Sequence, residues 1–162
     1  MITKNAQETI EYGELFAQKL KGGEIIALTG NLGSGKTTFV QGLAKGLKIK
    51  DNITSPTFVI LKEYTFRHAI LRPKSNLRGR ILWSKIKKLI HIDAYRIDNI
   101  NDIKSVGIED YLYRQDVIMV IEWADKIKEI LPKNIININF KAVVNGSNEL
   151  RKISINSSSS LK

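Results

Sequence analysis

The sequence predicts an α/β fold, and three observations support this prediction. Residues 24–47 contain a short apolar strand, a glycine-rich loop and an amphipathic helix in direct succession. The run VIMVI at 117–121 is apolar at every position, as expected for a strand with both faces covered. Residues 134–143 alternate with a period of two and lead to Asn145-Gly146, a hairpin signal, so we expect the chain to end as an antiparallel pair.

Two helices are predicted in the first third of the chain. The first spans residues 5–21, with Asn5 and Glu8 as its cap and Gly22-Gly23 as its stop. Its apolar face is predicted to carry Tyr12, Leu15, Phe16 and Leu20. The second helix, at 36–47, has an apolar face formed by Phe39, Leu43 and Leu47. Gly42 and Gly46 each cost about 1 kcal/mol in a helix, so we expect another element to pack closely against them.

The remaining elements follow in order along the chain. SPTFVILKEY, residues 55–64, predicts a strand after a proline turn, and LIHIDAYR, residues 89–96, predicts another. Residues 101–114 predict short helical pieces, and residues 124–131 predict a helix closed by a proline. Residues 1–156 are expected to form one domain, and the serine-rich end at 157–162 is expected to be disordered.

The composition excludes several kinds of protein. With 162 residues and 43% hydrophobic content, the chain has the size and core of one globular domain. The chain has no cysteine and two histidines, which excludes disulfides and thiolate metal sites and leaves too few ligands for a zinc cage. Neither a secretory leader nor an apolar run long enough to span a membrane is visible. We therefore expect a cytoplasmic protein.

The net charge of +10 is concentrated in one basic segment. Residues 67–90 contain eight lysines and arginines and no acidic residue, so they supply +8 of the +10. One interpretation is a solvated excursion whose own apolar side packs through Ile81, Trp83, Ile86 and Leu89. The other is an electrostatic contact with an anionic partner such as nucleic acid.

The loop GNLGSGKTTF carries the strongest chemical signal. It contains G-x-x-x-x-G-K-T after a predicted strand and before a predicted helix, which is the context of a phosphate-binding loop. Lys36 is expected to reach the β- and γ-phosphates of a nucleotide, and Thr37 to place its hydroxyl on Mg²⁺. The expected nucleotide-binding residues of the loop are Gly30, Asn31, Leu32, Gly33, Ser34, Gly35, Lys36, Thr37 and Thr38.

Two carboxylates qualify for a place near the metal, because each stands at the end of an apolar strand. Asp93 follows LIHI, and Glu122 follows VIMVI. His91 lies on the same face as Asp93 and is interpreted as a structural histidine. Tyr95 is interpreted as a residue that packs at the edge of the fold. Trp123, next to Glu122, is either a core aromatic or a wall of the site.

Four motifs in this order, GNLGSGKTTF, SPTF, HIDAYR and IEW, resemble those of the TsaE family. This family comprises the small P-loop ATPases of bacterial tRNA threonylcarbamoyladenosine synthesis. The resemblance spans nearly the whole chain apart from the basic segment and the serine tail. It implies a three-layer P-loop NTPase sandwich with a mixed central sheet, and it implies that the basic segment is an insertion at about 67–90.

The resemblance also implies roles for individual residues. The loop would bind ATP with Mg²⁺, Thr57 would face the γ-phosphate, and Trp123 would lie beside the nucleotide. Lys36, Asp93 and Glu122 would be the catalytic residues. Asp93 would support hydrolysis, and Glu122 would hold Mg²⁺ beside Thr37, either directly or through water.

The implied partners are the TsaD and TsaB proteins, which carry out the transfer to position 37 of tRNA and which this subunit would reset between turnovers. Contact with tRNA would be made through them, or directly through the basic segment. Two other functions stay open from the sequence. One is a small-molecule kinase whose lid is the basic segment, and the other is a nucleic-acid-binding module that uses the same segment.

Overall fold

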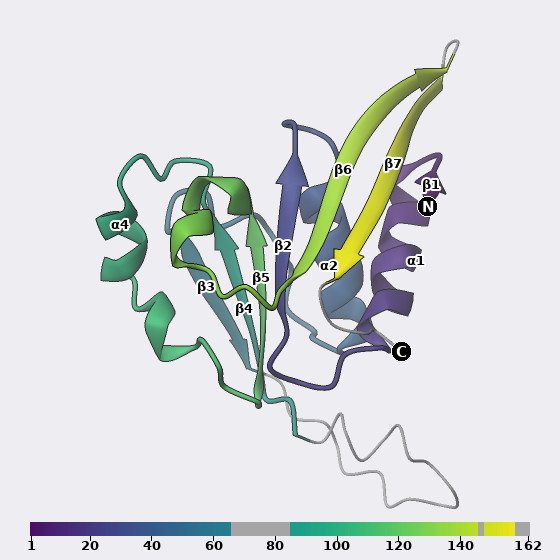
Figure 1. Ribbon diagram of the computed structural model, residues 1–162. Helices are drawn as coiled ribbons and strands as arrows, with labels where there is room; N and C mark the ends of the chain where they lie inside the picture. The colour runs from purple at the N-terminus through teal and green to yellow at the C-terminus, as the bar shows by residue number, and fades with distance from the viewer. Residues whose placement is uncertain (66–84, 146–147, 158–162) are drawn as a thin grey trace, which may run out of the picture.

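The computed structural model describes residues 1–65, 85–145 and 148–157, and within these ranges the strands form one sheet (Figure 1). The described strands are β1 (Ile2–Thr3), β2 (Ile25–Gly30), β3 (Leu61–Thr65), β4 (Lys88–Asp93), β5 (Val117–Glu122), β6 (Ile136–Asn145) and β7 (Asn148–Ser157). Their order across the sheet is β1-β7-β6-β2-β5-β4-β3. The phosphate-loop strand β2 therefore lies at the centre, between β6 and β5.

The sheet is mixed, as predicted. β2 runs parallel to β5 and β6, and β4 runs parallel to β5. The pairs β3 with β4, β6 with β7 and β1 with β7 are antiparallel. Because β2, β4 and β5 share one direction, their carboxyl ends meet at one edge of the sheet, where α/β proteins bind their ligands.

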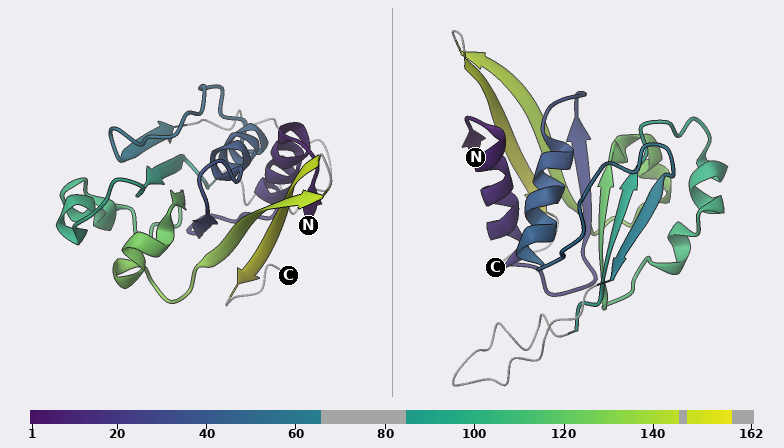
Figure 2. Two further views of the ribbon diagram at one scale, coloured as in Figure 1. Left: turned by 90° about the horizontal axis from the view of Figure 1, so that it is seen from above. Right: turned by 180° about the vertical axis from the view of Figure 1, so that it is seen from behind.

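Helices cover both faces of the sheet, which confirms the three-layer α/β architecture (Figure 2). On one face lie α1 (Ala6–Ala17) and α2 (Lys36–Gly46). The other face carries α4 (Ile100–Ser105), η1 (Ile108–Asp110) and η2 (Ala124–Ile130). Each face has its own buried core, with Phe39 and Phe140 in the first and Ile92 and Ile121 in the second.

Helices α1 and α2 approach each other so closely that glycine is required in both. A Cβ atom at Gly42 would lie 2.1 Å from the carbonyl oxygen of Ile10, and one at Gly13 would lie 2.4 Å from that of Phe39. The close packing predicted at Gly42 is therefore confirmed. The predicted buried face of α1 is wrong at Leu15, which is 58% exposed, because the side of α1 that packs against α2 carries Gly13 and Phe16.

Three predicted elements differ from the structure in their bounds or type. Helix α1 ends at Ala17 and not at residue 21, and tight turns connect it to the buried Leu20. The strand predicted after the proline turn of residues 55–64 begins only at Leu61, because the residues before it form a turn. The helix η2 is a 3₁₀ helix with a kink at Ile127.

The structure also differs from the prediction at two boundaries, the end of the basic segment and the end of the domain. Residues 67–84 of the basic segment lie outside the described ranges. Ile86 and Leu89 are buried in the core beneath α1 and α2 instead of packing within the segment, and β4 begins at Lys88. Ser157 pairs with Ile136 as the last residue of β7, so the predicted tail began one residue too early, and 158–162 lie outside the described ranges.

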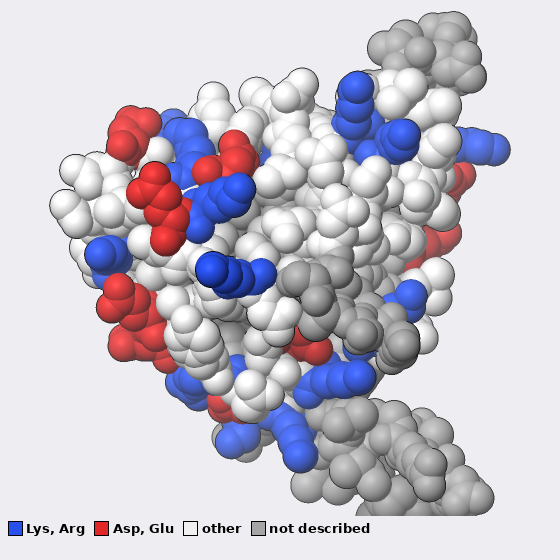
Figure 3. Space-filling model, in the orientation of Figure 1, with Lys and Arg blue, Asp and Glu red and all other residues white. Residues whose placement is uncertain are grey.

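The charges of the described residues are mixed in sign. On the face seen in Figure 3, basic and acidic side chains are interspersed over the region of α4 and η2. Within the described ranges, no helix is both long enough and apolar enough to cross a membrane.

Candidate nucleotide site

The glycine-rich loop turns through backbone conformations that favour glycine. The φ angles of Gly30, Gly33 and Gly35 are 134°, 74° and 99°, all in the left-handed region. At Gly30 a side chain is also excluded by space, because a Cβ atom would lie 2.2 Å from the carbonyl oxygen of Phe140 on β6. Helix α2 then begins at Lys36, so its N-terminal amide groups face the loop.

The Lys36 side chain folds back over the loop. Its Nζ donates to the carbonyl oxygens of Gly30 at 2.7 Å and Asn31 at 2.9 Å. The same nitrogen lies 3.9 Å from the ring centroid of Trp123, a cation–π contact. Burial lowers the pKa of Lys36, while the nearby Glu122 carboxylate acts in the opposite direction.

Glu122, at the carboxyl end of β5, has polar partners on two sides. The Thr37 hydroxyl lies 2.9 Å from both carboxylate oxygens of Glu122. From the neighbouring strand β4, the Nε2 atom of His91 lies 2.9 Å from Oε1. Both Glu122 and His91 are buried. The predicted metal pair Thr37 and Glu122 is thus in direct contact.

Asp93, at the carboxyl end of β4, holds the loop that precedes β3. Its Oδ2 accepts hydrogen bonds from the Ser55 hydroxyl and, at 2.7 Å, from the Thr57 hydroxyl. Its Oδ1 accepts from the backbone N–H of Tyr95 at 2.9 Å. This hydroxyl–carboxylate group, formed by Ser55, Thr57 and Asp93 and called the Asp93 clasp below, brings SPTF to the edge of the sheet.

A cavity of about 300 Å³ lies where these groups meet. Its lining comprises Leu32, Gly33, Ser34, Gly35, Lys36, Thr37, Thr38, Ser55, Thr57, Asp93, Tyr95, Glu122 and Trp123. Trp123 adopts φ 58°, which is rare outside glycine, and its ring lies 5.0 Å from that of Tyr95. Of the two roles considered for Trp123, the wall of the site is the one that this geometry supports.

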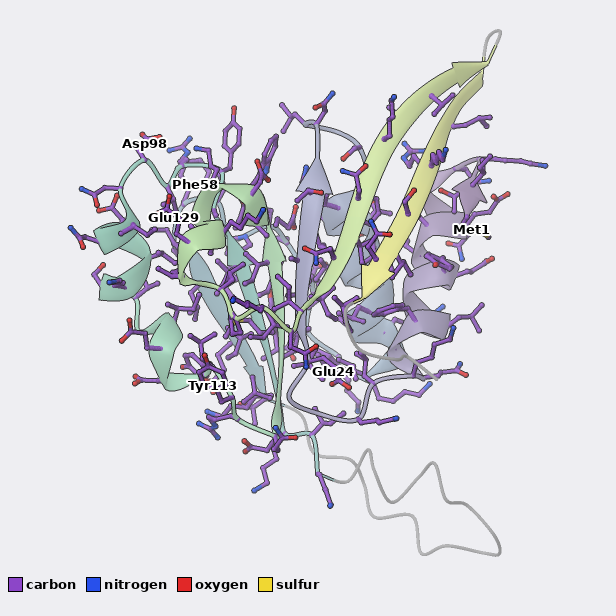
Figure 4. All side chains as sticks on the ribbon, in the orientation of Figure 1. Met1, Glu24, Phe58, Asp98, Tyr113 and Glu129 are labelled. Carbon is purple, nitrogen blue, oxygen red and sulfur yellow. The ribbon has the colours of Figure 1, made fainter. Side chains whose placement is uncertain are left out.

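The site lies at the end of the sheet where β2, β4 and β5 finish. Figure 4 labels Phe58 and Asp98 at this end of the molecule and Glu24 and Tyr113 at the opposite end. Phe58 follows the clasp residue Thr57, is 83% exposed, and has the Arg96 guanidinium 4.4 Å from its ring centroid.

Most of the predicted site residues converge on the cavity. The exceptions are Gly30 and Asn31, which are not among the lining residues and supply carbonyl oxygens to Lys36 instead. Ser55 and Tyr95 line the cavity although the sequence did not predict them as site residues. His91, interpreted from sequence as structural, contacts Glu122. The signals were present, because Ser55 begins the SPTF motif and His91 and Tyr95 flank Asp93 with a period of two.

Fold and site together define an α/β protein of the P-loop type. The family model "Threonylcarbamoyl adenosine biosynthesis protein TsaE" matches residues 3–152. The chain belongs to this family.

Several proteins of known name resemble the chain over most of its length. It is 32% identical to the tRNA threonylcarbamoyladenosine biosynthesis protein TsaE of Treponema pallidum, covering 92% of this chain and 96% of that protein. It is 34% identical to the Bacillus subtilis protein of the same name, covering 91% and 80%. The crystal structure of Bacillus subtilis YdiB matches with a TM-score of 0.65 and 31% identity, covering 96% of this chain and 84% of that one. These similarities support both the family and the fold.

Proposed function

We propose that the chain binds ATP with Mg²⁺ and hydrolyses it as a cytoplasmic subunit of the assembly that makes threonylcarbamoyladenosine at position 37 of tRNA. The observation that carries this proposal is the convergence of Lys36, Thr37, Asp93 and Glu122 on one cavity beside a glycine-rich loop. Loop, cation, hydroxyl and carboxylates are the parts that P-loop enzymes use for phosphoryl transfer.

The loop and helix α2 account for phosphate binding. The N–H groups of residues 33–37 and the positive end of α2 would contact the phosphate oxygens. Lys36 would exchange the carbonyl oxygens of Gly30 and Asn31 for the β- and γ-phosphates, because phosphate is the stronger partner for an ammonium group. The buried Ser34 hydroxyl also lines the cavity and has no hydrogen-bond partner among the described residues.

The oxygen atoms of Thr37 and Glu122 fit a magnesium ion. Hydroxyl and carboxylate oxygens are the hard ligands that Mg²⁺ takes, and the ion keeps its other positions for water and phosphate. Within the described ranges, no group of three or more histidines or acidic residues is arranged to enclose a metal ion. This agrees with an ion held by one hydroxyl, one carboxylate and the nucleotide. Bound there, Mg²⁺ would neutralise charge on the β- and γ-phosphates.

Asp93 would support hydrolysis through the loop it holds. Its clasp keeps the Thr57 hydroxyl at the cavity, where this residue would face the γ-phosphate. The carboxylate itself is at the cavity wall, so it can also orient a water for attack. Lys36 would stabilise the negative charge of the transferring group, and Glu122 would contribute through the Mg²⁺ that it holds.

A small-molecule kinase stays the alternative function, because residues 67–84 of the basic segment, which would form its lid, lie outside the described ranges. The proposed partners are the TsaD and TsaB proteins, and hydrolysis would reset this pair after each transfer. Contact with tRNA would be made through the pair, or directly through the basic segment, whose lysines and arginines would meet the phosphate backbone.

The proposal is tested by copurification of the chain with the TsaD and TsaB pair, with and without ATP. ATP-dependent association, together with phosphate release that consumes no acceptor, is expected. Transfer of the γ-phosphate to an acceptor molecule would support the kinase instead. A variant that lacks residues 66–84 tests the tRNA contact, because its association with the tRNA-loaded pair should weaken most at low salt while ATP binding stays unchanged.

A further inference from the structure

His91 is a buried polar side chain to which the proposed function gives no role. It lies within β4, is fully buried, and is not among the residues that line the cavity. Its Nε2 atom nevertheless lies 2.9 Å from Oε1 of Glu122. The histidine therefore reaches the site only through this carboxylate.

The sheet register sets this contact. β4 and β5 are parallel, with Asp93 opposite Glu122 and His91 opposite Val120. His91 thus stands two residues before Asp93 on the same face of β4, and its ring extends along the strand to the Glu122 carboxylate. Strand β4 therefore supplies both Asp93, which holds the SPTF loop, and His91, which contacts the proposed magnesium ligand Glu122.

Hydrogen-bond accounting assigns the proton of the ring. An ionised carboxylate can only accept, so the Nε2 atom that contacts Glu122 must donate. The Nδ1 atom is buried and has no partner among the described residues. A tautomer with its proton on Nδ1 would bury an unsatisfied donor and lose the bond to Glu122, which costs about 1–3 kcal/mol. The Nε2–H tautomer is the one that fits.

The two partners of Glu122 act on different sides of the carboxylate. His91 contacts Oε1 alone from the interior of the sheet, whereas the Thr37 hydroxyl lies at equal distance from Oε1 and Oε2. Without the His91 bond, the carboxylate could rotate about its last side-chain torsion, which has a broad energy minimum. The His91 bond removes that freedom.

We propose that His91 is a positioning residue: its Nε2–H fixes the Glu122 carboxylate in the orientation in which Glu122 and Thr37 together hold Mg²⁺. This inference rests on the proposed function, because it assumes that Glu122 is a magnesium ligand. Hydrogen-bonded partners of this kind orient the ligands of metal sites, and their removal commonly lowers metal affinity by about 10–100-fold.

Two substitutions separate positioning from packing. His91→Leu fills the buried space and removes the donor, whereas His91→Gln restores an N–H at nearly the position of Nε2. Ile90→Val, at the neighbouring buried position of β4, is the control for a general loss of strand stability. Each variant is titrated with a fluorescent ADP analogue, in Mg²⁺ and in EDTA.

For His91→Leu, the Mg²⁺-dependent gain in nucleotide affinity should fall by about 10–100-fold, with the affinity in EDTA unchanged. His91→Gln should recover most of the gain, and Ile90→Val should keep all of it. A His91→Leu protein with the wild-type gain would overturn the inference. A wild-type protein that binds nucleotide without any gain from Mg²⁺ would instead overturn the proposed metal site.

The tautomer provides a second measurement that needs neither metal nor nucleotide. Long-range ¹H–¹⁵N correlation spectra of the metal-free protein should show the His91 proton on Nε2, and Glu122→Ala should abolish its slow exchange with solvent. A wild-type ring with its proton on Nδ1 and none on Nε2 would contradict the positioning role directly.

Discussion

The Asp93 clasp predicts a measurable coupling between SPTF and strand β4. In Thr57→Val a methyl group replaces a hydroxyl that lies 2.7 Å from the buried Asp93 carboxylate, with little change in shape. A hydrogen bond to a charged group contributes about 1.5–3 kcal/mol. Because Thr57 is only half-buried and Ser55 still donates to the same oxygen, we expect the low end, about 1.5 kcal/mol, in the free energy of unfolding. For a domain of this size the melting temperature should fall by roughly 3–6 °C.

Urea denaturation of the nucleotide-free protein measures this loss, and a double-mutant cycle assigns it. Thr57→Val and Asp93→Ala should be non-additive by about 1 kcal/mol or more, because both remove the same bond. The matched control is Thr54→Val in the same loop, whose hydroxyl accepts only an exposed bond from Lys62 and should change stability by less than about 0.5 kcal/mol. Additive effects of Thr57→Val and Asp93→Ala would refute the clasp.

Three further predictions follow from the site and its support. Lys36→Met should weaken binding of a fluorescent ATP analogue by roughly 10–100-fold through the loss of charge-assisted bonds, whereas Lys45→Met on the exposed side of the same helix should leave it unchanged. Glu122→Ala should lower the hydrolysis rate much more than the affinity for nucleotide in EDTA, and equal losses would mark the residue as structural. Gly42→Ala should lower the melting temperature although alanine favours helices by about 1 kcal/mol, because its Cβ would meet the Ile10 carbonyl; an unchanged or higher melting temperature would show that α1 can move aside.

The sequence predicted the parts of the site that depend on short, contiguous segments of the chain. The loop could be found because glycine, lysine and threonine occur at fixed spacing between a strand and a helix. Asp93 and Glu122 could be found because each carboxylate ends an apolar run, and parallel strands bring such ends to one edge. These features depend on short stretches of chain and on the direction of the strands alone.

The contacts that the sequence did not predict depend on register between distant segments. His91 meets Glu122 because β4 pairs with β5 in one particular alignment, and no local pattern fixes that alignment. The SPTF residues form a turn instead of a strand, because the Ser55 and Thr57 hydroxyls donate to Asp93 at the edge of the sheet. On α1, the apolar periodicity predicted that Leu15 would be buried, whereas the side that packs against α2 is the one with Gly13.

ATP hydrolysis by the chain in the presence of the TsaD and TsaB pair tests the proposed function most directly. Phosphate release is measured for the chain alone, for the pair alone and for the mixture, with the wild-type chain and with Lys36→Met. We predict release that requires the wild-type chain, increases when the pair is added, and is lost in Lys36→Met. A rate that is the same with Lys36→Met, or no release from the mixture at all, would contradict the proposal that this site hydrolyses ATP for the tRNA-modifying assembly.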